Sequence, residues 1–72
     1  MIQLNVVNLL KKQNKSKYWL YNAINNVRPI SYTNFNAMLT NKTKSIKYEN
    51  IELLCNLLQC EPNDLFTKSD TL

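Results

Sequence analysis

Apolar side chains recur at helical spacing along much of this chain, and no other feature constrains its fold as strongly. Two segments show the i, i+3, i+4, i+7 stripe that a helix with one buried face requires. The stripes are Leu20, Ala23, Ile24 and Val27, and Ile51, Leu54, Cys55 and Leu58. No segment alternates clearly between apolar and polar residues, as a half-buried strand would. The sequence therefore predicts an all-α fold without strands.

Capping residues and helix breakers set the expected bounds of the helices. Ser16 and Ser31 are good N-caps, because a serine hydroxyl accepts a hydrogen bond from a free amide of the next turn. Pro29 disfavours helical backbone at the residue before it, and we expect the chain to leave the second helix at Asn25 and Asn26, because Asn tolerates left-handed dihedrals. The expected helices are 5–13, a second from Lys17, 32–40, a fourth through 51–58, and a short last one from Pro62.

Length and composition limit the kind of protein. Seventy-two residues make one domain, near the lower size at which a core sustains a fold unaided. We expect a compact bundle of four to five short helices over residues 1–72, with 67–72 as a frayed tail. The chain lacks the basic and apolar start of a signal peptide, and no stretch approaches the roughly 20 apolar residues of a membrane span. We therefore expect a cytoplasmic protein with no membrane contact.

The residues that usually carry metal or catalytic chemistry are scarce. Cys55 and Cys60 are the only cysteines, and there is no His. Two thiols five residues apart do not complete a tetrahedral zinc site, and we interpret both as thiols that pack in the core. We expect no metal and no cofactor. Without His or a Gly-rich loop, and with acids only in the last third, the chain does not resemble an enzyme.

Charge is distributed unevenly along the chain. Residues 1–48 contain eight basic side chains and no acidic one, whereas residues 49–72 contain five acidic side chains and only Lys68 as a base. A basic segment of this kind suits a polyanionic partner such as nucleic acid. Many small proteins also have a basic face that is simply solvated, so charge alone leaves both interpretations open.

The outward face of the third expected helix carries side chains that can form hydrogen bonds. Counting about 100° per residue from Phe35 defines this face. It consists of Thr33, Asn36, Ala37 and Thr40, with Tyr32 and Asn34 on its flanks. Asn can bond an adenine edge with both the oxygen and the NH2 group of its amide, and Thr can contact a thymine methyl. Any one of these residues is equally explained by solvation, but the set favours a recognition helix in the major groove.

Side chains around this helix suit contacts with the DNA backbone. Lys17 and Tyr18 open the second helix, where amide dipoles commonly bind phosphate. Lys42, Thr43 and Lys44 follow the third helix and would position the protein without reading sequence. Arg28 lies in the turn between the two helices, where it either reaches phosphate or a groove edge or points to solvent.

Four segments resemble the Cro/C1-type (XRE family) helix-turn-helix regulators: SKYWL (16–20), ISYTNFN (30–36), NKTKS (41–45) and LCNLLQCEPNDL (54–65). The resemblance covers nearly the whole chain. It implies a five-helix DNA-binding domain, usually dimeric on operator DNA, as in bacterial and phage repressors and in antitoxins. By position, it implies a phosphate contact for Lys17, backbone contacts for Lys42 and Lys44, and base contacts for Tyr32, Thr33, Asn34 and Asn36.

Two features depart from the family pattern. Tyr21 replaces the small residue usual where the second and third helices cross, and residues 22–29 make their connection several residues longer than usual. A longer turn costs little loop entropy, but it changes the tilt of the third helix and so the individual base contacts.

The predicted function is sequence-specific binding of duplex DNA by a small homodimeric transcriptional regulator, most simply a repressor. The alternative is a protein-binding module of the same fold, an antitoxin or adaptor, with the fourth helix or the Leu65 and Phe66 end as its interface. The many Asn, Lys and Ile residues are what A/T-rich codons encode, which indicates a low-GC bacterium or one of its mobile elements.

Overall fold

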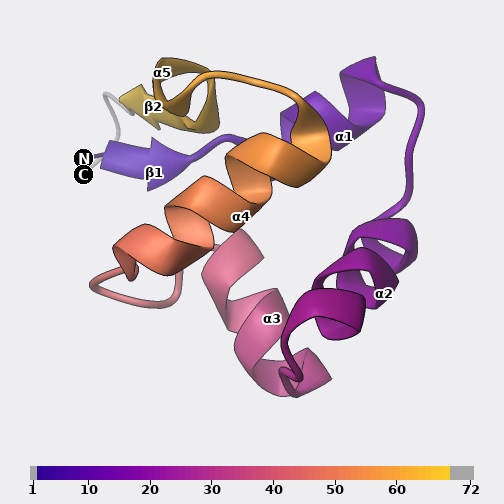
Figure 1. The fold of residues 1–72 in the computed structure, drawn as a ribbon. Helices are drawn as coiled ribbons and strands as arrows, with labels where there is room; N and C mark the ends of the chain where they lie inside the picture. The colour runs from indigo at the N-terminus through magenta and orange to yellow at the C-terminus, as the bar shows by residue number, and fades with distance from the viewer. Residues whose placement is uncertain (1, 69–72) are drawn as a thin grey trace.

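Five helices and two short strands form residues 2–68, the part of the chain that the computed structural model describes. In chain order they are β1 (Ile2–Leu4), α1 (Val6–Lys12), α2 (Lys17–Val27), α3 (Tyr32–Leu39), α4 (Tyr48–Leu58), α5 (Pro62–Leu65) and β2 (Phe66–Lys68) (Figure 1). The mostly helical architecture confirms the predicted fold class. Among these residues, no helix is long and apolar enough to cross a membrane.

The apolar stripes of the helices meet in one core. Its buried side chains are Val6, Leu10, Leu20, Ile24, Phe35, Met38, Leu39, Leu54, Leu58 and Leu65. Cys55 and Cys60 are free thiols that lie partly buried against this core, as expected. Val27 was expected in the buried stripe of α2, but it is 65% exposed because it is the last residue of that helix. Phe35, Met38 and Leu39 form the buried face of α3, so its opposite face is the one that faces outward.

Both predicted serine caps are present. The Ser16 hydroxyl accepts a hydrogen bond from the Trp19 amide at 3.0 Å, and the Ser31 hydroxyl accepts one from the Asn34 amide at 3.2 Å. These bonds satisfy amides that a first helical turn leaves without partners. The starts of α2 and α3 are therefore defined by local sequence, as predicted.

The predicted end of α2 at Asn25 and Asn26 is wrong, because the helix continues to Val27. Asn25 is used inside the helix: its Nδ2 donates to the Tyr21 carbonyl at 3.0 Å, and its Oδ1 accepts from the Ile30 amide at 3.1 Å. Arg28, which precedes the proline, is extended and ends the helix. The connection to α3 is therefore only residues 28–31, and the additional residues lengthen α2 instead of the turn.

Within residues 2–68, three residues take the left-handed conformation that glycine usually provides. Asn14, Asn41 and Gln59 have φ values of 59°, 61° and 51° and follow α1, α3 and α4 respectively. The chain contains no glycine, and Asn is among the residues that tolerate this conformation best. These positions end the helices where a glycine would be expected.

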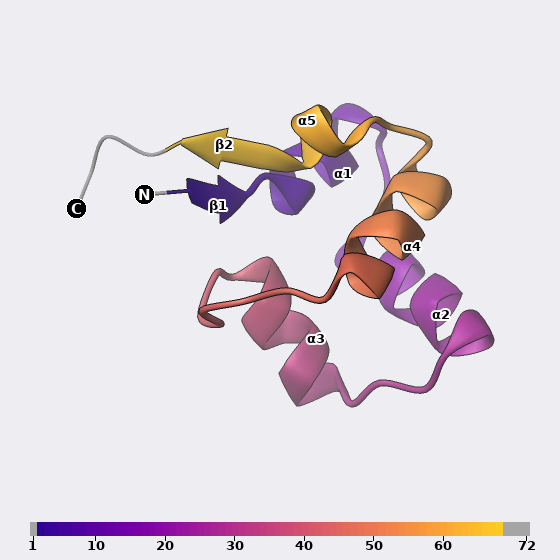
Figure 2. The same cartoon turned by 60° about the vertical axis from the view of Figure 1, so that its left-hand side comes forward.

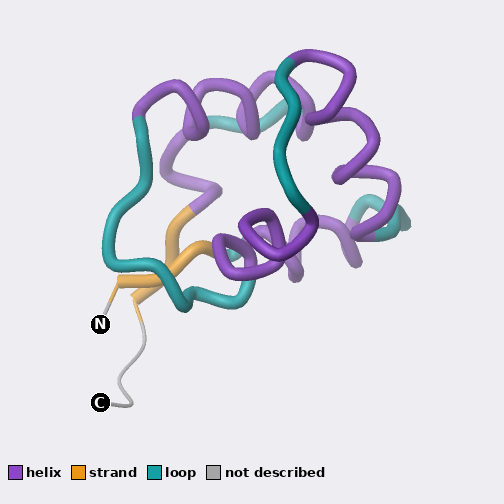
Figure 3. The backbone as a smooth tube through the Cα atoms, turned by 90° about the horizontal axis from the view of Figure 1, so that it is seen from below, coloured by secondary structure: helices purple, strands orange, loops and turns teal. Residues whose placement is uncertain are grey.

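A two-stranded antiparallel sheet joins the two ends of the chain. Ile2 faces Lys68, Gln3 faces Thr67, and Leu4 faces Phe66. The prediction of no strands is therefore wrong, and so is the prediction of a frayed tail for Thr67 and Lys68; the rest of that tail, residues 69–72, lies outside the described residues. Three-residue strands are too short to show alternation, and their partners lie at opposite ends of the sequence. Figures 2 and 3 show the strands side by side at one end of the helical bundle.

Candidate DNA-binding surface

Tyr21 forms an aromatic contact between α2 and α3. Its ring centroid lies 5.2 Å from that of Tyr32, in an edge-to-face arrangement, and 5.3 Å from that of Phe35. These separations are in the range that favours aromatic pairs. The large residue noted as a departure from the family pattern therefore packs against two aromatic residues of α3. This cluster, together with the short 28–31 turn, sets how α3 is held on α2.

Lys17 and Asn36 are brought together by the crossing of these helices. The Lys17 ammonium donates a hydrogen bond to Asn36 Oδ1 at 2.8 Å, from the first residue of α2 to the middle of α3. A charged donor makes this a comparatively strong side-chain bond. The Asn36 amide keeps one lone pair on its oxygen and both N–H donors. One predicted phosphate-contacting residue thus orients one predicted base-contacting residue.

The outward side of α3 is accessible. Tyr32, Thr33 and Asn34 are exposed, Asn36 and Ala37 are partly exposed, and Thr40 is exposed. The Thr40 hydroxyl donates back to the Asn36 carbonyl at 2.7 Å, which removes its own donor from this surface. The remaining groups are amide, hydroxyl and phenol groups of both donor and acceptor type. Groups of these types can pair with the donors and acceptors on base edges in the major groove.

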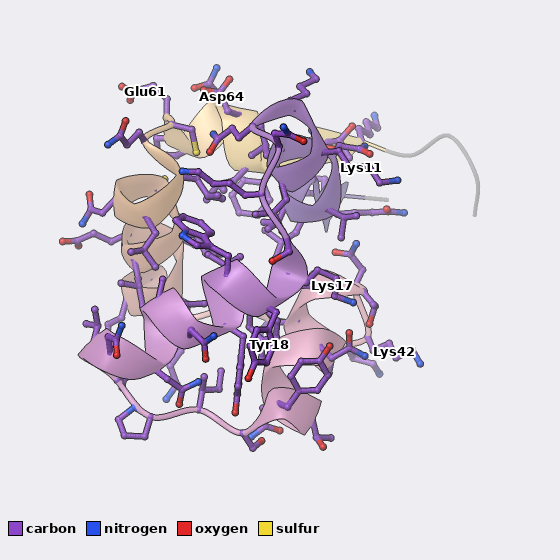
Figure 4. All side chains as sticks on the ribbon, turned by 90° about the vertical axis from the view of Figure 1, so that its right-hand side faces the viewer. Lys11, Lys17, Tyr18, Lys42, Glu61 and Asp64 are labelled. Atoms are coloured by element: carbon purple, nitrogen blue, oxygen red, sulfur yellow. The ribbon has the colours of Figure 1, made fainter. Side chains whose placement is uncertain are left out.

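Basic side chains surround this face. Lys42, Thr43 and Lys44 are exposed in the loop that follows α3, and Tyr18 is 67% exposed on the first turn of α2. Figure 4 shows Lys17, Tyr18 and Lys42 on one side of the molecule, with Glu61 and Asp64 at its other end. The first turn of a helix such as α2 also leaves backbone amides without a partner inside the helix, which suits an anion.

Lys11, near the end of α1, lies in Figure 4 between Lys17 and the end of the molecule that carries Glu61 and Asp64. Lys11 was not among the residues predicted from the sequence to contact DNA. Its charge was visible as part of the basic segment, but spacing along the chain did not show where α1 lies. Lys11 adds a positive charge outside the helix-turn-helix.

Arg28 differs from the other predicted residues. Its guanidinium forms an ion pair with Glu49 in the first turn of α4, with an N–O distance of 2.9 Å. Arg28 and Lys17 also lie at opposite ends of α2, because Lys17 is the first residue of this 11-residue helix and Arg28 follows its last one. The structure therefore does not place Arg28 with Lys17 and Tyr18, and part of its charge is already compensated.

Comparison with models of protein families gives a match to the Cro/C1-type HTH DNA-binding domain over residues 5–70. No curated protein and no solved structure matched the chain in the corresponding comparisons. The family match includes all five helices and therefore both helices of the helix-turn-helix. The predicted resemblance is confirmed, and the chain belongs to the family of Cro/C1-type helix-turn-helix DNA-binding domains.

Proposed function

We propose that this protein binds duplex DNA at a specific sequence and represses transcription, with α3 in the major groove. The observation that carries the proposal is the Lys17–Asn36 hydrogen bond. This bond joins the start of α2, which suits contact with a phosphate, to the outward face of α3, which suits contact with base edges. In a major-groove complex these two surfaces meet the DNA together.

The side chains then divide into two roles. Base contacts are assigned to Tyr32, Thr33, Asn34 and Asn36, and backbone contacts to Lys17, Tyr18, Lys42, Thr43 and Lys44, with Arg28 in a lesser role. Asn36 is the best candidate for an adenine contact, because its amide retains both donors and an acceptor. Tyr32 packs on Tyr21 with one side but is 47% exposed, so its ring suits apolar contact with a thymine methyl.

We further propose that the protein acts as a homodimer. Helix α3 has eight residues, so it is roughly 12 Å long and covers about four base pairs. Four base pairs cannot distinguish one site among the many competing sequences of a genome. A second copy would place another recognition helix about 34 Å away, one turn along the same face of the duplex.

Selection from random-sequence duplex at two salt concentrations tests these proposals, with the wild type, Asn36→Ala and Lys42→Ala compared in parallel. We expect a palindromic site to be enriched. Asn36→Ala should reduce the discrimination between correct and incorrect bases at one position in each half-site by about 1–3 kcal/mol. Lys42→Ala should weaken binding to every sequence alike, because phosphate contacts carry no base information.

Failure of the wild type to retain any duplex at low salt would contradict the proposal and favour the protein-binding alternative. That alternative was predicted to use α4 or the Leu65 and Phe66 end, where the most deeply buried side chains cannot form an interface. Leu54, Leu58 and Leu65 are at most 1% exposed, and Phe66 is partly buried and paired with β1. An apolar interface would also be nearly insensitive to salt, whereas binding to phosphates weakens steeply.

A further inference from the structure

Asn41 connects the end of α3 to the first strand. Its Oδ1 accepts a hydrogen bond from the Leu4 amide at 2.7 Å, and its Nδ2 donates to the Leu4 carbonyl at 3.3 Å. Both backbone groups of Leu4 are thus bonded by one side chain, as a neighbouring strand would bond them. Because Leu4 faces Phe66 on the other side, Asn41 occupies the edge of β1 that β2 leaves free.

The backbone of Asn41 is also held against α3. Its amide donates to the Met38 carbonyl at 3.3 Å, and the next amide, that of Lys42, donates to the Ala37 carbonyl at 2.9 Å. With φ at 61°, the backbone alone would be served better by glycine. What asparagine adds is the pair of bonds to Leu4.

These bonds matter for the loop that follows. Lys42, Thr43 and Lys44 are all exposed, and the next contact with the core is made by Ile46. A hollow of about 240 Å³ lies between this loop and β1, bordered by Leu4, Asn41, Lys44, Ile46 and Phe66. Packing therefore does not fix the distance between the loop and the sheet, and Asn41 is the residue that bridges it.

We propose that Asn41 is a positioning residue for DNA binding, holding Lys42 and Lys44 where they meet the DNA backbone by anchoring their loop to Leu4. This inference rests on the proposed function, because it assigns a role within the same surface. It also gives β1, which lies outside the helix-turn-helix, a part in DNA binding.

The test compares Asn41→Gly with the matched control Asn14→Gly. Both replace a left-handed asparagine by glycine at the end of a helix, but only the first removes bonds to Leu4. Binding to the selected site and to random duplex is measured across salt concentrations, at a temperature where Trp19 fluorescence shows every variant fully folded. Under these conditions a change in fold stability alone does not alter affinity.

We expect Asn41→Gly to weaken binding to both duplexes by roughly three- to tenfold, because freed lysines must be ordered again on binding. The slope of log affinity against log salt should become shallower by up to about two per protomer if both lysines lose their phosphates. Asn14→Gly should stay within about twofold of the wild type, with an unchanged slope, because it leaves these phosphate contacts in place.

A double-mutant cycle shows whether the effect passes through the lysines. Replacing Lys42 and Lys44 by Ala should cost less affinity in the Asn41→Gly protein than in the wild type, because coupled residues are not additive. The role of Asn41 would be overturned if Asn41→Gly kept the wild-type affinity and salt slope, or if replacing the two lysines cost the same affinity in both backgrounds. Either result would leave the proposed function intact. No duplex binding by the wild type would instead overturn the proposed function, and this inference with it.

Discussion

Among single residues, Asn25 has a structural role that its half-buried position makes important. Its Nδ2 donates to the Tyr21 carbonyl in the preceding turn of α2, and its Oδ1 accepts from the Ile30 amide beyond the turn. A half-buried backbone amide that loses its partner is costly, because desolvation is no longer compensated. The turn between α2 and α3 is therefore stabilised by a side chain and not by a glycine.

We predict that Asn25→Ala lowers the free energy of unfolding by about 1–2 kcal/mol, because the Ile30 amide loses its acceptor. Asn26→Ala is the matched control: Asn26 is the next residue on the helix, and it is exposed. Its effect should be within about 0.5 kcal/mol of zero, as for most surface substitutions. Urea unfolding of both variants, followed by circular dichroism, gives the comparison, and equal effects would contradict the role assigned to Asn25.

Cys60 provides a prediction about pH. Burial, with a smaller contribution from nearby Cys55, raises the pKa of its thiol from 9.0 to about 11. The thiolate is the reactive form, so alkylation of Cys60 by iodoacetamide should be slower in the folded protein than in urea at pH 9. Because the folded-state pKa is raised, the contribution of this thiol to stability is complete below about pH 9 and is lost towards about pH 11. Peptide mass spectrometry after timed alkylation measures the rate; equal rates in both states at pH 9 would refute the shift.

At the level of elements, the helices could be predicted because their signals are local. The stripes of α2 and α4 and the caps Ser16 and Ser31 are each contained in one short segment. The strands were missed because their pairing is not local: Leu4 and Phe66 are separated by nearly the whole chain, and each strand has only three residues. The end of α2 was misplaced because Asn25 bonds across the turn, a contact that helix propensity does not describe.

The proposed recognition helix, α3, begins at the Ser31 cap, which leads to a prediction for this residue. Replacing Ser31 by Ala removes the acceptor of the Asn34 amide and should cost about 1 kcal/mol of stability. Because Thr33 and Asn34 lie in this first turn, discrimination between DNA sequences should fall as well. Ser45→Ala, at an exposed serine in the loop after α3, is the control for stability and should have little effect. Thermal unfolding and binding to the selected site would test this; full stability in Ser31→Ala would show that the cap is dispensable.

The candidate site as a whole was only partly predictable. Residues on one face of α3 follow from helical geometry, and the structure leaves them exposed or partly exposed as expected. The Lys17–Asn36 and Asn41–Leu4 bonds depend on how distant segments pack, so spacing along the chain did not reveal them. For the same reason Arg28 was grouped with the lysines, although its partner Glu49 lies on α4.

At the scale of the whole molecule, Lys17 and Lys42 lie near α3 and Glu61 and Asp64 lie at the other end, which should orient the protein on DNA. If Lys17, Lys42 and Lys44 each neutralise one phosphate, log affinity should fall against log salt with a slope of about −3 for one protomer and about −5 for a dimer. Replacing Lys42 and Lys44 together by Ala should make the dimer slope shallower by about three to four. Glu52→Gln, at an exposed acid on α4, changes the net charge without touching this surface and should leave the slope unchanged. Fluorescence anisotropy of labelled duplex at several salt concentrations measures these slopes, and a slope that responds equally to Glu52 and to the lysines would mean that net charge, not the α3 surface, binds DNA.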